Sequence, residues 1–171
     1  MQVDEISLLA PSWYVSIQVQ PYGSTVPSLT NLVHFTANNE DNSEYGSRIP
    51  AIFFKENSRK LVVCSAVNQN KNYCYTSPKD LPVDEYTTVE VSQIQFKGGP
   101  LNGKYELQIK INGTTVHNVE NAQPRFFGNV KVYRSDRWYT TPNALIKNFV
   151  CGNLPYGKSC FSVTEDNLKV K

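Results

Sequence analysis

Hydrophobic and polar residues alternate along most of this chain, and the clearest stretch covers residues 104–116. Four apolar side chains would fall on one face of a strand there: Tyr105, Leu107, Ile109 and Ile111. The residues between them are polar or charged, and the alternation ends at Asn112-Gly113, a pair that tolerates the positive φ angles of a type I′ turn. The segment therefore predicts a β-hairpin with one dry face and one solvated face.

The same alternation predicts strands along the rest of the chain. They are expected at Trp13–Gln20, Thr30–Ala37, Arg48–Lys55, Lys60–Val67, from Tyr73 to Thr76, at Tyr86–Phe96, Val116–Val119, Asn129–Arg134 and Ala144–Val150. Residues 1–11 show no regular pattern and are expected to form an irregular lead-in. No window has the spacing of an amphipathic helix.

Ten to twelve short strands favour two packed antiparallel sheets, because one open sheet of that size would leave an apolar face exposed to solvent or edge strands unpaired. We therefore expect an all-β sandwich in a single domain over 1–171. Its core would span about 13–150, and residues 151–171 would form a C-terminal extension. The strand at 86–96 changes phase between Val91 and Ile94, which predicts a β-bulge at Ser92-Gln93.

Charge and hydropathy exclude several classes of partner. The chain has 17 basic and 15 acidic residues, for a net charge of +2 without a basic stripe, which argues against nucleic acid. No segment approaches the roughly 18–20 apolar residues of a membrane span. The first residues also lack the basic and long apolar regions of a signal peptide. A secreted form would therefore have lost its signal or would be part of a longer protein.

Four cysteines occur as two closely spaced pairs, and three pairings are possible. Local pairing is favoured, with Cys64 bonded to Cys74 and Cys151 bonded to Cys160. The reason is that Cys64 would end one strand and Cys74 would begin the next. Zinc is the alternative, but neither pair has the usual short ligand gap, and His34 and His117 lie far along the chain. Disulfides would indicate an extracellular or cell-surface protein. Asn112-Gly113-Thr114 is in addition a glycosylation acceptor on the hairpin tip.

The order of segments resembles a known family. An apolar strand ends in His34-Phe35 and a polar loop leads to residues 45–53; the remaining segments are Leu61-Val62-Val63, residues 88–93, the hairpin ending in Asn112-Gly113, and residues 127–133. Over roughly 13–150 this order is similar to the concanavalin A-like jelly roll and, within it, to the laminin G-like branch. The resemblance implies a curved two-sheet sandwich that binds glycans or proteins in adhesion and matrix proteins.

Laminin G-like modules often hold a calcium ion at the rim with a pair of acidic side chains. The two acids of that pattern cannot both be matched to positions in this sequence. The nearest candidates are in one oxygen-rich loop: Glu40, Asp41 and Glu44. Such a loop suits calcium, and the alternative is that it is simply solvated. The sequence therefore establishes no cofactor, and calcium is the candidate.

Three polar and aromatic loops are the candidate binding sites. Sugar recognition requires planar polar groups for hydroxyls and a ring for the apolar sugar face, and these loops have both. The candidate residues are Asn38, Asn39, Tyr45 and Arg48 in the first loop, Asn68, Asn70, Tyr73 and Tyr75 in the second, and Arg134, Asp136, Trp138 and Tyr139 in the third. The alternative is that these loops are polar only because loops are solvated, with Trp138-Tyr139 capping the sandwich.

No residue set indicates catalysis. The retaining glycosidases of this fold need two nearby carboxylates, whereas the longest strand has only Glu90 after its opening residues. His34 and His117 are isolated, and there is no Gly-x-Ser-x-Gly turn. The sequence therefore predicts a non-enzymatic extracellular recognition or adhesion module that binds glycan or a protein partner through rim loops. The rival hypothesis is a structural subunit that self-associates.

Overall fold

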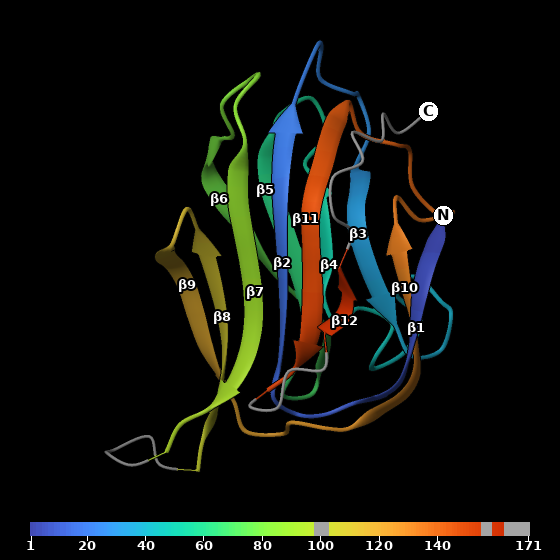
Figure 1. The fold of residues 1–171 in the computed structure, drawn as a ribbon, viewed down its shortest axis with the longest axis vertical. Coiled ribbons are helices and arrows are strands. Elements are labelled where there is room, and N and C mark those ends of the chain that lie inside the picture. The colour runs from blue at the N-terminus through green and yellow to red at the C-terminus, as the bar shows by residue number, and fades with distance from the viewer. Residues whose placement is uncertain (98–102, 155–158, 163–171) are drawn as a thin grey trace.

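The computed structural model describes residues 1–97 and 103–154 in full and the backbone of 159–162. Its strands form two six-stranded antiparallel sheets packed face to face (Figure 1). The first sheet has the order β1 (Gln2–Leu9), β10 (Phe127–Arg134), β3 (Thr30–Thr36), β4 (Ala51–Phe54), β5 (Lys60–Val67) and β6 (Asn70–Asp80). The second has the order β12 (Ser159–Ser162), β11 (Ala144–Asn153), β2 (Trp13–Pro21), β7 (Thr87–Gln95), β8 (Tyr105–Ile111) and β9 (Thr114–Asn121). The predicted all-β sandwich is confirmed.

The core lies between the two sheets and is made by alternate side chains of their strands. Its largest fully buried members include Trp13, Ile17, Leu32, Phe35, Ile52, Leu61, Leu107 and Ile109. Each such side chain contributes about 1.5–3 kcal/mol through burial. Among the described residues, no helix is long and apolar enough to span a membrane.

The β8–β9 hairpin has the turn that the sequence predicts. Ile111 pairs with Thr114, and the two residues between them have φ angles of 48° at Asn112 and 76° at Gly113. The register then shifts, because Ile109 pairs with His117 while Lys110 pairs with Thr115. Val116 is therefore an extra residue, and the bulge of this sheet edge lies in β9.

The predicted bulge at Ser92-Gln93 is wrong. Strand β7 pairs with β2 and with β8 without a break in register, and Gln93 takes the inward position with only 3% of its surface exposed. Its amide nitrogen donates to the carbonyl of Pro11 (2.6 Å), and its amide oxygen accepts from Asn121 (2.6 Å). Because both polar atoms are satisfied, glutamine can occupy a core position and the alternation continues unchanged.

The predicted irregular lead-in is also wrong, since residues 2–9 form the edge strand β1 alongside β10. Only two of its residues, Ile6 and Leu9, are buried, so the alternating pattern is too weak to read from the sequence. The α-amino group of Met1 donates to the carbonyls of Arg134 and Ser135. The start of the chain is thus held against the loop that follows β10.

Candidate ligand-recognition site

Loop 135–143, which joins β10 to β11, crosses the outer face of the first sheet. Its backbone is held on β3 by a hydrogen bond from the Ser135 amide to the Leu32 carbonyl (3.1 Å) and by another from the Asn31 amide to the Thr140 carbonyl (3.3 Å). The Asp136 amide also donates to the Asn31 side chain (3.0 Å). As a result, all seven residues of β3 are buried, and polar groups are enclosed beneath this loop and loop 37–50.

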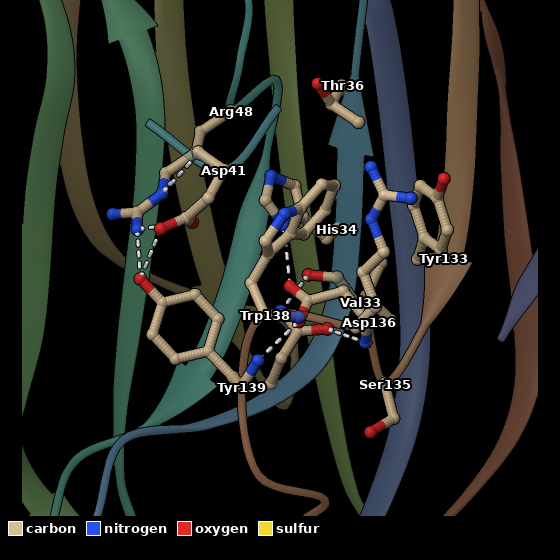
Figure 2. Close-up of polar contacts among 12 residues, drawn as sticks. Val33, His34, Thr36, Asp41, Arg48, Tyr133, Ser135, Asp136, Trp138 and Tyr139 are labelled. Atoms are coloured by element: carbon tan, nitrogen blue, oxygen red, sulfur yellow. Dashed lines mark hydrogen bonds and ion pairs between the residues drawn. The ribbon is translucent and has the colours of Figure 1, made fainter. Parts of the chain in front are cut away.

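His34 and Asp136 form the innermost contact of this region (Figure 2). The Nδ1 atom of His34 lies 2.7 Å from Oδ2 of Asp136, its Nε2 lies 2.7 Å from the carbonyl oxygen of Ser47, and both side chains are fully buried. A carbonyl only accepts, so Nε2 must donate. A further proton must then lie between Nδ1 and the carboxylate. Oδ1 of Asp136 accepts from the amides of Trp138 and Tyr139, both at 3.0 Å.

A second polar group surrounds Arg48, which is 5% exposed. Its guanidinium donates to the backbone carbonyl of Asp41 (3.2 Å), to the Asp41 carboxylate (2.8 Å), to Asn72 (2.6 Å) and to the hydroxyl of Tyr139 (2.7 Å). The same hydroxyl donates to the other oxygen of Asp41 (2.8 Å). The guanidinium also lies 5.0 Å from the centre of the Phe53 ring. Arginine, tyrosine and aspartate therefore form a closed set of charge-assisted bonds.

Tyr139 has a perturbed hydroxyl in this set. Burial, and then the hydrogen bond to Asp41, raise the pKa of Tyr139 to about 12, and the positive charge of Arg48 only partly opposes this. Both effects favour the protonated hydroxyl. Near neutral pH this group is thus a fixed hydrogen-bond donor to Asp41.

Trp138 and Arg137 form the outer layer of the region. The indole lies over His34 at 5.2 Å and meets Tyr133 edge to face at 5.5 Å between ring centres. The exposed guanidinium of Arg137 is 4.9 Å from the centre of the indole ring and also donates to the carbonyl of Asn39 (3.3 Å). The Tyr133 hydroxyl donates to the Asn39 side chain (2.5 Å). We call the surface made by Asn39, Asn72, Arg137 and Trp138 the rim.

The structure brings together part of the predicted set. Asn39, Arg48, Asp136, Trp138 and Tyr139 are in this region, and the Asn38 side chain bonds Ser47 at its border. Arg134 is half-buried at the start of the covering loop, and burial lowers its pKa. His34, Asn31, Asn72 and Tyr133 were not predicted. For His34 the sequence did contain a signal of a buried polar site, because this histidine lies inside an otherwise apolar strand.

The other predicted residues lie elsewhere. Tyr73 and Tyr75 stack on His117 with ring centres 5.8 and 4.8 Å apart, which joins β6 to β9 across the two sheet edges. The side chain of Asn68 bonds the backbone of Glu120 and Ala122. These contacts hold the two sheets together rather than adding to the rim.

Asn70 and Tyr45 are also outside the rim. The side chain of Asn70 accepts from the amide of Asn72 within its own turn (2.9 Å). Tyr45 stacks on Phe127, and the Arg125 guanidinium lies 4.1 Å from its ring centre. Burial raises the pKa of Tyr45.

The predicted calcium ligands do not form a site. Both oxygens of the Asp41 carboxylate accept from Arg48 and Tyr139, while Glu40 and Glu44 are exposed. Within residues 1–97 and 103–154, no group of three or more histidine, cysteine, aspartate or glutamate side chains is arranged to hold a metal ion. An arginine paired with the central carboxylate supplies the positive charge that calcium would have supplied.

The predicted Cys64–Cys74 disulfide is confirmed. The two residues are directly opposite each other in β5 and β6, with the sulfur atoms 2.08 Å apart. Cys64 packs with Ala51 and Phe53 beneath Tyr139, so the disulfide adjoins the site. Cys151 is buried in β11. The side chain of Cys160 lies outside the described residues, and its pairing with Cys151 stays a prediction.

Similar structures identify the fold. No protein-family model matches the sequence, and no curated protein matches it significantly. An endo-β-1,4-glucuronan lyase from Trichoderma reesei aligns with a TM-score of 0.58 at 12% identity, over 95% of this chain and 76% of the lyase. A heptameric SAP-like pentraxin from Limulus polyphemus aligns with a TM-score of 0.56 at 9% identity, over 88% of this chain and 67% of the pentraxin. An alginate lyase from a Chlorella virus aligns with a TM-score of 0.53 at 12% identity, over 84% of this chain and 72% of the lyase.

This chain has the concanavalin A-like jelly-roll fold. At identities near 10% the likeness establishes the fold alone, because one fold supports many unrelated functions. Membership of the laminin G-like branch remains a prediction. Function depends on the residues of the site rather than on the fold.

Proposed function

We propose that this chain is a non-catalytic extracellular module that recognises glycans at the rim. The observation that supports this proposal is the closed polar network beneath the rim. Each of the central groups, His34, Arg48, Asp136 and Tyr139, already has its hydrogen-bonding partners within the protein. The network holds the covering loop in one conformation, and a preorganised surface loses little entropy when a ligand binds.

The same network disfavours catalysis. A lyase of uronate polysaccharides needs a base that can approach the sugar, and the candidates here are His34 and Tyr139. His34 is fully buried with both ring nitrogens engaged. The Tyr139 hydroxyl donates to Asp41, and its pKa is raised to about 12, so it does not give up its proton readily near neutral pH. We therefore take the likeness to two lyases as a likeness of fold.

The chemistry of the rim suits a sugar. The half-exposed Trp138 indole and the Arg137 guanidinium that lies over its ring form one pair, which combines apolar ring surface with several donors in one plane. The amides of Asn39 and Asn72 add planar polar groups on either side. Sugars have one apolar face and a border of hydroxyls, which is the pattern that an aromatic ring among planar polar groups complements. The Cys64–Cys74 disulfide beneath Tyr139 supports an extracellular setting.

A glycan array with matched variants tests the proposal. Arg137→Gln and Trp138→Ala should each weaken binding to the glycans that the parent chain binds, by about tenfold for the tryptophan because it would contribute most of the apolar contact. Tyr14→Ala is the matched control, since Tyr14 is a half-exposed ring on the outer face of the second sheet. Circular dichroism of each variant ensures that only folded protein is compared.

Three results would contradict the proposal. They are an array without hits, equal losses for Trp138→Ala and Tyr14→Ala, and the ultraviolet absorbance of an unsaturated uronate when the chain is incubated with glucuronan or alginate. Sedimentation of the same sample tests the rival hypothesis. A concentration-dependent oligomer without glycan binding would favour a structural, self-associating subunit.

A further inference from the structure

A groove of about 420 Å³ opens where β6 of the first sheet meets the β8–β9 hairpin of the second. These three strands lie along the same edge of the molecule (Figure 1). The groove has a largely apolar lining, which includes Tyr75, Pro78, Leu81, Pro82, Ile111 and Val116. Val116, the extra residue of the β9 bulge, is 37% exposed. The groove is on a different part of the surface from the rim.

Asn112 is at the border of this groove and begins the acceptor tripeptide Asn112-Gly113-Thr114. Two hydrogen bonds hold it to Thr88 of β7: its amide donates to the Thr88 carbonyl (2.9 Å), and its side-chain oxygen accepts from the Thr88 amide (2.9 Å). Both bonds leave the Nδ2 atom available. Because Nδ2 is the atom to which an N-linked sugar is attached, modification would preserve both bonds and the turn.

Thr87 supplies a polar group within the same lining. It is 1% exposed, and in the part of the chain that the structure describes its hydroxyl has no hydrogen-bond partner. A buried hydroxyl without a partner is unusual and costly. A ligand with an apolar face and hydroxyl or amide groups at its border would match both the apolar walls and the polar lining residues Ser77, Lys79 and Asp80. An N-acetylglucosamine ring has that chemistry.

We propose that Asn112 carries an N-linked glycan whose first sugar lies in this groove, over Val116 and Ile111. The sugar would cover the end of β9, an edge strand whose residues 114–121 include neither lysine nor proline. Lysine, proline, other charged residues and bulges all discourage an edge strand from pairing with other chains, and β9 has only the bulge at Val116 and the single charge of Glu120. The glycan would therefore stabilise the hairpin and block association through this edge. The proposal shares the extracellular setting of the proposed function but does not depend on glycan recognition at the rim.

The first experiment tests attachment. The chain is produced in a secreting eukaryotic cell, and the peptide that contains Asn112 is analysed by mass spectrometry before and after enzymatic removal of N-glycans. Thr114→Val should abolish the modification while preserving an exposed strand position, and Thr114→Ser, which keeps the acceptor pattern, should retain it. Secreted parent chain without sugar on Asn112 would overturn the proposal.

The second experiment tests the groove. The glycan is trimmed to its first sugar, and we expect nuclear Overhauser contacts between its acetyl methyl group and the methyl groups of Val116 or Ile111. The trimmed form should melt about 2–4 °C above the fully deglycosylated chain, and Val116→Ser should remove most of that gain. A glycan that gives no such contacts, or an equal gain in Val116→Ser, would overturn the groove assignment. A glycan array with the unglycosylated chain tests the rim separately, so the two proposals can fail independently.

Discussion

The outer face of the second sheet is solvated, whereas the outer face of the first sheet over β3 and β4 is covered by loops 37–50 and 135–143. On the second sheet, outward residues of β2 such as Tyr14, Ser16 and Gln18 are half-exposed between fully buried neighbours. On the first sheet, every residue of β3 and β4 is buried. The outward residues there include His34 and Phe53, whose partners are supplied by the covering loops.

This difference shows where polar side chains are enclosed by the protein instead of being hydrated. Keeping His34, Arg48 and Asp136 out of water is costly unless each has partners, and the loops together with Asn72 of β6 provide those partners at 2.6–3.2 Å. The second sheet needs no such arrangement, because its outer polar groups remain hydrated. The shape of the surface above the enclosed network is thus fixed by the bonds beneath it.

The largest expected effect is on the covered face. Asp136→Ala removes the acceptor for His34 and for the amides of Trp138 and Tyr139, so it should lower the free energy of unfolding by about 3–5 kcal/mol. The matched change on the solvated face, Glu90→Ala, should lie within about 0.5 kcal/mol of the parent chain. Urea denaturation of both variants measures the contrast.

A third variant sharpens the same comparison. Asp136→Asn can still accept from the two amides, and its NH₂ group can donate to Nδ1 of His34 while Nε2 continues to donate to Ser47. It should therefore be clearly more stable than Asp136→Ala. Equal losses for the two variants would show that the charge of Asp136, rather than its hydrogen bonds, holds the covering loop.

A smaller effect is expected at the hairpin of the second sheet. Gly113 has a φ of 76°, and a Cβ added there would meet nothing within 4 Å. Gly113→Val should therefore act through backbone strain alone, lowering the free energy of unfolding by about 1–2 kcal/mol. Thr114→Val, at the next position, should be nearly neutral because strands favour branched residues. Thermal melts of unglycosylated protein compare the two, and equal melting temperatures for Gly113→Val and the parent would contradict the turn geometry.

Sequence reasoning succeeded where the signal was local and was weaker where the partners come from distant parts of the chain. The alternation in 104–111 and the Asn112-Gly113 pair are local signals, and they predicted the hairpin correctly. The Cys64–Cys74 disulfide was equally local. In contrast, the pairing of His34 with Asp136 joins residues 102 positions apart, and no local pattern specifies it. The bulge prediction failed for a related reason, because the burial of Gln93 depends on Asn121 from another strand.

The smallest expected effect concerns how the free energy of unfolding falls at alkaline pH. In the unfolded chain a tyrosine titrates near pH 10, whereas the pKa of Tyr139 in the folded protein is raised to about 12 by burial and by its bond to Asp41. Between these values the folded state keeps the proton that the unfolded state has lost. The associated stability is therefore fully present below about pH 10 and is lost progressively as the pH rises toward 12.

Tyr139→Phe should flatten this alkaline decline, even though losing the bonds to Arg48 and Asp41 makes the variant less stable at neutral pH. Melting temperatures of both chains from pH 8 upward give the comparison, and the quantity of interest is the difference in slope. The remaining tyrosines, including the perturbed Tyr45, are present in both chains and cancel. Parallel slopes would mean that the Tyr139 hydroxyl titrates as it does in water. The network beneath the rim would then be open to solvent, like the outer face of the second sheet, and the contrast between the two faces would not hold.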